Sequence, residues 1–160
     1  TAVEWLLAHP ETLEQREYPD APLTRGRFVG LLYAAAGSPA AAAEAGFQDL
    51  LSIEWFLPAV NWAAETGVTG GTAEGAFAAA RHLTWQEAAV FLVRTVEALG
   101  LEPEAVRTAP LPDALAEGAW DQTALELAWE WGLLPEDAGS AAEIARVQGG
   151  AMADAFAALL

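Results

Sequence analysis

The chain has 160 residues, of which 54% are hydrophobic, so it is long enough to bury the core of one domain or of a few small repeats. Its formal net charge of −16 disfavours binding to nucleic acid and to anionic membrane surfaces, because both present negative phosphates. Cysteine and lysine are absent, which excludes disulfide bonds and thiolate metal sites and makes arginine the only permanently charged basic residue.

Three short segments share one apolar pattern. They are AVEWLLAHP (2–10), AVNWAAETG (59–67) and ALELAWEWG (124–132). Apolar residues at positions i, i+1 and i+3 are typical of one buried helical face, and a proline or glycine closes each segment. We predict a short helix in each. The first pattern begins at the second residue, without a methionine or a basic leader, so we expect an N-terminally truncated first copy rather than a signal peptide.

A longer apolar segment follows each short one. These segments are LTRGRFVGLLYAAAG (23–37), LTWQEAAVFLVRTVEALG (83–100) and VQGGAMADAFAALL (147–160). Aligning Leu32, Leu92 and Phe156 separates successive copies by roughly 60 residues, a spacing typical of a repeated supersecondary unit. The sequence therefore predicts an all-α fold built of three helix-loop-helix repeats.

Turn-rich segments connect the predicted repeats. Each carries an acidic residue and then a tryptophan just before the next short helix: Asp49 and Trp55 in one, Asp113 and Trp120 in the other. No strand pattern of convincing length interrupts the helical ones. The predicted repeats lie at about residues 1–40, 44–100 and 110–160 of a single domain, 1–160.

The middle repeat has an ordered set of motifs. It opens with Phe47-Gln48-Asp49 ahead of a tryptophan, and its short helix ends in Gly67-Val68. A glycine-containing loop with a late phenylalanine, residues 69–82, precedes a long helix that begins with the segment 83–87, LTWQE. This order resembles the S-layer homology domain, closely over about residues 44–100 and more weakly in the flanking repeats.

The resemblance implies a pseudo-threefold bundle of the three repeats. It also implies non-catalytic anchoring at the extracellular cell surface, to the cell wall or the S-layer. The implied partner is a secondary cell-wall polysaccharide, an anionic glycan that often carries pyruvate ketals. In the family, an arginine at the start of the long helix contacts the anionic sugar. That position falls on Arg25 in the first repeat, on Trp85 in the second and on Gly149 in the third.

Candidate glycan contacts gather at the starts of the first two long helices. Thr84 and Glu87 fit a capping box, and Thr24 is expected to cap its helix too, although Arg27 replaces the acidic partner there. Trp85, in a first helical turn, is the best-placed tryptophan for an exposed indole face on which a sugar stacks. The predicted glycan-binding residues are Arg25, Thr24, Arg27, Trp85 and Thr84.

Two arginines in one first helical turn oppose the helix dipole. Arg25 and Arg27 are therefore expected to have an anionic partner, either the glycan or an acidic residue of the chain such as Asp20. Gly149-Gly150 at the third helix start is open to two interpretations, a flexible joint or a helix N-terminus that a ligand approaches closely.

The other tryptophans fit a packing role better than a sugar-binding one. Trp5 and Trp62 lie at core positions of the predicted short helices and are expected to be buried. Trp129 and Trp131 are two residues apart and cannot share one side of a helix. One of these two is expected to be exposed or at an interface.

No pattern in the chain predicts catalysis, a metal site or a cofactor. His9 and His82 lack further ligands at metal-site spacing. A P-loop, a dinucleotide fingerprint and a Ser/His/Asp arrangement are all missing. No apolar run reaches the roughly 20 residues of a membrane-spanning helix, so membrane insertion is not expected.

Two non-enzymatic functions stay open. The first is an anchoring module in which Arg25 contacts an anionic wall glycan. The second is a structural assembly protein, in a surface layer or a virion shell, that uses the same scaffold for protein–protein contacts. The second hypothesis rests on the loss of the motif arginine in two repeats and on the apolar end AMADAFAALL (151–160), a possible docking helix. An unrelated helical bundle would be the third interpretation.

Overall fold

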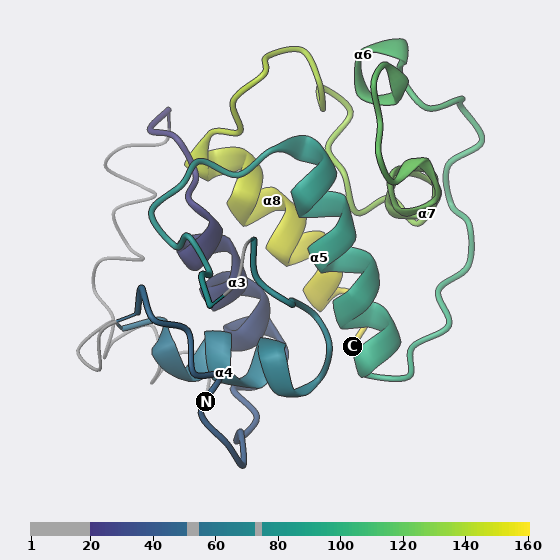
Figure 1. Ribbon diagram of the computed structural model, residues 1–160. Helices are drawn as coiled ribbons and strands as arrows, with labels where there is room; N and C mark the ends of the chain where they lie inside the picture. The colour runs from purple at the N-terminus through teal and green to yellow at the C-terminus, as the bar shows by residue number, and fades with distance from the viewer. Residues whose placement is uncertain (1–19, 51–54, 73–74) are drawn as a thin grey trace.

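A computed structural model of the chain describes residues 20–50, 55–72 and 75–160 (Figure 1). Within these ranges the prediction of an all-α fold is confirmed, with two isolated β-bridges beside the helices. The predicted helix at 2–10 and the packing role of Trp5 lie outside the described residues. The helices are α3 (Arg25–Ala35), α4 (Leu57–Glu65), α5 (Trp85–Ala98), α6 (Asp113–Ala116), α7 (Gln122–Glu130) and α8 (Arg146–Ala157).

The starts of α3 and α5 are capped as predicted. Thr24 Oγ1 accepts a hydrogen bond from the backbone N–H of Arg27 at 3.4 Å. At α5, Thr84 Oγ1 accepts from the N–H of Glu87, and a Glu87 carboxylate oxygen accepts from the N–H of Thr84, both at 3.2 Å. The capping box at the second long helix is therefore confirmed, and such a cap stabilises a helix by about 0.5–2 kcal/mol.

The predicted register of the third long helix was wrong by three residues. Helix α8 begins at Arg146, so Arg146 rather than Gly149 takes the position that Arg25 has in α3. Its cap comes from Gln148, whose side-chain oxygen accepts from the N–H of Ala145 at 2.9 Å.

Both interpretations of Gly149-Gly150 were also wrong, because Gly149 lies inside α8. A Cβ at Gly149 would stand 2.5 Å from Cδ2 of Leu23, so the missing side chain lets α8 pack closely on the segment before α3.

The segments before the three long helices are joined by backbone hydrogen bonds. The N–H of Leu83 donates to the carbonyl of Leu23 at 2.9 Å, and the N–H of Leu23 donates to the carbonyl of Ile144 at 2.8 Å. All three side chains are buried. The three helix starts therefore meet in the core, although the pseudo-threefold relation between whole repeats stays a prediction.

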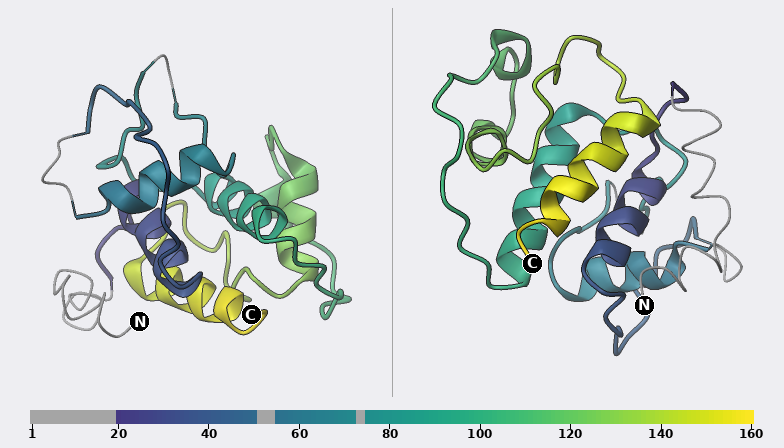
Figure 2. Two further views of the ribbon diagram at one scale, coloured as in Figure 1. Left: turned by 90° about the horizontal axis from the view of Figure 1, so that it is seen from below. Right: turned by 180° about the vertical axis from the view of Figure 1, so that it is seen from behind.

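The short helices pack on the long helices that precede them in the chain. Helix α4 lies against α3, and α7 lies against α5. Helix α8 lies beside α3 in Figure 1 and in the right-hand view of Figure 2. None of the helices in the described ranges is long and apolar enough to cross a membrane.

The core fills the space between these helices, mainly with aliphatic and phenylalanine side chains. Trp62 is buried against Tyr33, with ring centroids 5.9 Å apart, which confirms its predicted packing role. Met152 and Phe156 of α8 are fully buried, so the prediction of an exposed docking helix at the C-terminal end was wrong for the face that carries them.

Candidate functional site

A pocket of about 540 Å³ opens beside the first turns of α5. Its walls come from the loop at 69–72, from Arg25 at the start of α3 and from one side of α5. Val90 and Phe91 form an apolar surface inside it, and Trp120 contributes from the segment before α7. The pocket therefore combines residues from all three predicted repeats.

The Arg25 side chain is buried in the wall of this pocket. Its Nε donates to the carbonyl of Phe77 at 3.0 Å, and its guanidinium pairs with the carboxylate of Glu87. The cation also lies 5.1 Å from the ring centre of Phe77 and 5.0 Å from that of Phe91, within cation–π range. Burial lowers the pKa of Arg25 and Glu87 opposes that shift, but a guanidinium stays protonated in a protein.

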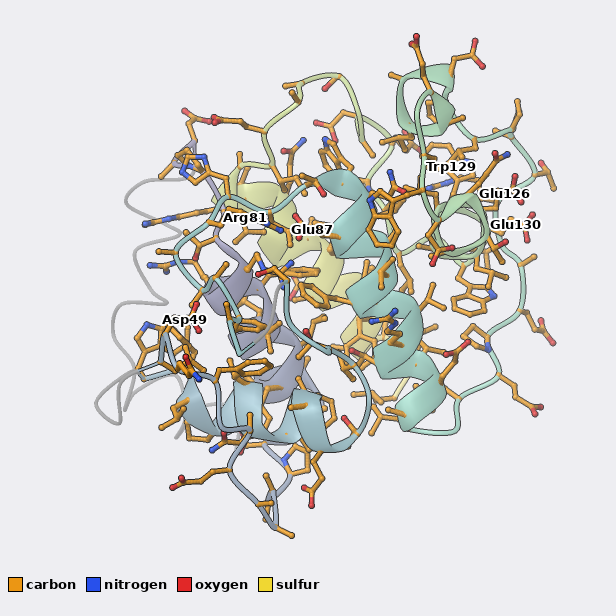
Figure 3. All side chains as sticks on the ribbon, in the orientation of Figure 1. Asp49, Arg81, Glu87, Glu126, Trp129 and Glu130 are labelled. Carbon is orange, nitrogen blue, oxygen red and sulfur yellow. The ribbon has the colours of Figure 1, made fainter. Side chains whose placement is uncertain are left out.

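Glu87 connects the pocket to the fold of α5. Its carboxylate pairs with both Arg25 and Arg81 and also closes the capping box with Thr84. Figure 3 shows Arg81 and Glu87 next to each other at the start of α5. The Glu87 side chain is 12% exposed, whereas that of Arg81 is 51% exposed, so Arg81 reaches from the ion pair into solvent. The expectation that an acidic residue of the chain pairs with Arg25 is confirmed, although this residue is Glu87 and not Asp20, the example given.

Asp49 holds the backbone that supports Arg25. Its two carboxylate oxygens accept from the N–H groups of Phe77 at 2.9 Å and Ala78 at 2.8 Å. The hydrogen bond from Phe77 is the main reason that the pKa of Asp49 lies below its usual value. Because Phe77 offers its carbonyl to Arg25, Asp49 positions the arginine indirectly. The acidic residue of the predicted opening motif thus has a structural role.

The structure separates the five predicted glycan contacts. Arg25 and Thr84 line the pocket, whereas Thr24 and Arg27 do not. The prediction that Trp85 exposes a stacking face was wrong, because only 6% of it is exposed and its indole N–H donates to the carbonyl of Ala141 at 2.8 Å.

Trp129 of α7 is buried, and Trp131, just after the helix, is partly buried against the core. The two differ in burial as expected, but neither is fully exposed. Arg107 lies over the Trp129 ring at 3.9 Å from its centre and donates to the carbonyl of Leu134 at 2.9 Å. Figure 3 shows Trp129 together with two glutamates at α7, well away from the Arg81–Glu87 pair.

Sequence reasoning missed most residues of the pocket, among them its other two arginines, Arg81 and Arg94, together with His82 and Trp120. Arg94 follows Glu87 by seven residues, so helical periodicity could have placed both on one side of α5. Trp120 is distant in sequence and no local pattern connects it to the others.

The charge inside this pocket is opposite to that of the whole chain. Three of the seven arginines line it, with His82, and Glu87 is the one acidic residue among the described lining residues. A local excess of cations in a chain of net charge −16 creates a focused positive field that favours an anionic ligand. Across the residues that the structure describes, no group of three or more acidic or histidine side chains could hold a metal ion.

The fold and the pocket together define a helical module with a cationic recess, in which motifs of the second predicted repeat supply most of the walls. Residues 46–89 match the family model of the S-layer homology domain, so this part of the chain is similar to that family. Domains of this family anchor proteins to the cell wall or the S-layer and are associated with the cell surface. No curated protein matches the chain.

Proposed function

We propose that the chain is a non-catalytic anchoring module at the extracellular cell surface, and that its pocket beside α5 binds an anionic secondary cell-wall glycan. One observation supports this most: among the described residues, three arginines and a single glutamate line one recess of a strongly acidic chain. An anionic ligand overcomes the repulsion of the whole chain only at such a local excess of positive charge.

The lining residues contribute to binding in different ways. Arg81 and Arg94 are exposed, and a carboxylate such as that of a pyruvate ketal competes with Glu87 for Arg81 and with the carbonyl of Val68 for Arg94. Arg25 is fixed by its hydrogen bond and adds positive potential from the wall. Val90 and Phe91, which are only 5% and 3% exposed, add an apolar patch to the pocket wall rather than a stacking face. No atom lies within 4 Å of where a Cβ at Gly70 would stand, so a ligand has room to approach that backbone.

Binding to purified cell walls tests this function. The walls are prepared with the pyruvate ketals intact and after their removal, and bound protein is measured by co-sedimentation. We expect Arg81→Gln and Arg94→Gln each to weaken binding to intact walls by about tenfold, because each removes a charge-assisted contact. Ala43→Glu changes the net charge by the same amount at an exposed loop position outside the pocket, and should bind like the unmodified protein.

Arg25 is unsuitable as the first test variant, because its truncation also disturbs the fold. Equal binding by the two arginine variants, the control and the unmodified protein would refute the proposed pocket. If the unmodified protein bound neither kind of wall and formed stable oligomers in solution, the assembly function would be favoured instead. Equal binding to intact and depyruvylated walls would keep the pocket but replace pyruvate by another anionic group.

A further inference from the structure

Trp120 is the large aromatic side chain with the greatest recorded exposure in the described part of the chain. It is 65% exposed and lines the pocket beside α5. Single exposed apolar side chains are common on proteins and require no explanation by themselves. A second tryptophan, at the corresponding position of the preceding predicted repeat, is packed instead of exposed, and this contrast suggests a role for Trp120.

Trp55 occupies that corresponding position, just before α4, and it packs on α3. A Cβ at Gly30 would stand 2.7 Å from the Trp55 ring, and a Cβ at Gly26 would stand 3.1 Å from the Phe56 ring. Two glycines one helical turn apart therefore leave the space that residues 55 and 56 fill. This contact between the first and second predicted repeats is closed by aromatic packing.

The matching contact on α5 is built differently. Counted from the capping threonines, the positions of Gly26 and Gly30 are taken in α5 by Gln86 and Val90. Val90 fills the space that a glycine leaves open in α3, and it lines the pocket. An indole ring therefore lacks the gap that it would need to pack against α5 as Trp55 packs against α3.

Gln86 fixes the backbone at this place. Its side-chain oxygen accepts from the N–H of Trp120 at 2.5 Å and from the N–H of Asp121 at 2.7 Å. Asp121 in turn caps α7 through the N–H of Ala124 at 3.0 Å. The main chain at Trp120 is thus held from two directions, while its ring stays in solvent at the edge of a cationic recess.

We propose that Trp120 forms a second sugar subsite, so that the pocket takes at least a disaccharide unit. The charged ring lies at Arg81 and Arg94, and the neighbouring ring stacks on the indole of Trp120. An indole face suits the apolar carbon face of a sugar, and burying it recovers area that the fold leaves exposed. This inference rests on the proposed function, because it extends the same anionic pocket.

The test compares two synthetic ligands that carry the same pyruvate ketal, a monosaccharide and a disaccharide, by calorimetric titration. For the unmodified protein, we expect the disaccharide to bind about tenfold more tightly, a gain in the range of one aromatic contact. Trp120→Ala should bring the ratio of the two affinities close to one, and Trp120→Phe should preserve most of the ratio. Arg81→Gln should weaken the binding of both ligands.

The outcomes separate this inference from the function on which it rests. An unchanged ratio in Trp120→Ala would overturn the second subsite while leaving the anionic pocket intact. If the unmodified protein bound neither ligand, the pyruvylated glycan and its second subsite would both be refuted, and the wall-binding test would decide on the pocket itself. We expect Trp120→Ala to unfold at the same temperature as the unmodified protein, since the exposed ring contributes little to the core. A large fall in that temperature would instead assign Trp120 a structural role.

Discussion

Replacing Glu87 by glutamine removes the carboxylate that pairs with Arg25 and Arg81. The Arg25 side chain is 4% exposed and that of Glu87 is 12% exposed, so this ion pair is largely shielded from water. Removing one partner of a buried ion pair costs about 3–5 kcal/mol, because the remaining charge loses its counter-charge. The glutamine amide oxygen still accepts from Thr84, so we expect a cost near 3 kcal/mol for Glu87→Gln.

A loss of that size is measurable by urea or thermal unfolding. About 3 kcal/mol corresponds to roughly 6–12 °C in the midpoint for a chain of this length. Glu97→Gln is the matched control, because it makes the same change of charge at an exposed position of the same helix and should stay within about 0.5 kcal/mol. If Glu87→Gln unfolded like this control, the Arg25–Glu87 pair would not support the fold as argued.

The same substitution should act on ligand binding in the opposite direction. Glu87 competes with an incoming anion for Arg25 and Arg81, so its removal makes the recess more positive. We therefore expect Glu87→Gln to bind a pyruvylated wall saccharide several-fold more tightly at low salt, with the gain shrinking as salt rises. Lower stability together with weaker binding would indicate a general loss of structure.

Three further substitutions test the supports around the site. Asp49 has a lowered pKa in the fold, so its stabilisation is complete above its unfolded pKa of about 3.9 and is lost as pH falls through the folded value. The difference in unfolding free energy between the unmodified protein and Asp49→Asn should shrink below about pH 4, and a constant difference would be contrary evidence. Gly149→Ala should lower stability by about 1–2 kcal/mol in chemical denaturation, because its Cβ would overlap Leu23; a gain in stability would show that the core yields there. Arg107→Met should cost about 1–2 kcal/mol through lost contacts to Trp129 and to a carbonyl, and an unchanged midpoint would assign those contacts no net value.

Local signals in the sequence were sufficient for the fold class and for the capped helix starts. A hydroxyl residue followed by an acidic residue three positions later defines a capping box within four residues, and Thr84 with Glu87 forms one. The match to the S-layer homology domain covers the same helix start.

The predicted start of α8 was wrong for a physical reason. A helix turns about once every 3.6 residues, so a shift of three residues leaves nearly the same side facing the core, and the apolar pattern alone cannot exclude it. The start of this helix also lacks a side-chain acceptor at its N-cap, Ala145, while Gly149-Gly150 resembled a break.

The pocket could be predicted only in part because its members come from distant segments. Arg25 and Glu87 are 62 positions apart, and Trp120 joins them from a third segment. The burial of Trp85 depends on the carbonyl of Ala141, which lies 56 positions away. The acidic residue that neutralises Arg25 was likewise uncertain from the sequence, because the chain has 23 acidic residues.

The most direct measurement for the anionic pocket is an NMR titration of ¹⁵N-labelled protein with a pyruvylated wall saccharide. Binding at the recess predicts the largest shift changes at the backbone of Gly70 and at the side chains of Arg81 and Arg94. Shift changes centred on Arg107 and Trp129 instead, or saturation at the same positions by the saccharide without its ketal, would contradict the assignment of the pocket to a negatively charged glycan.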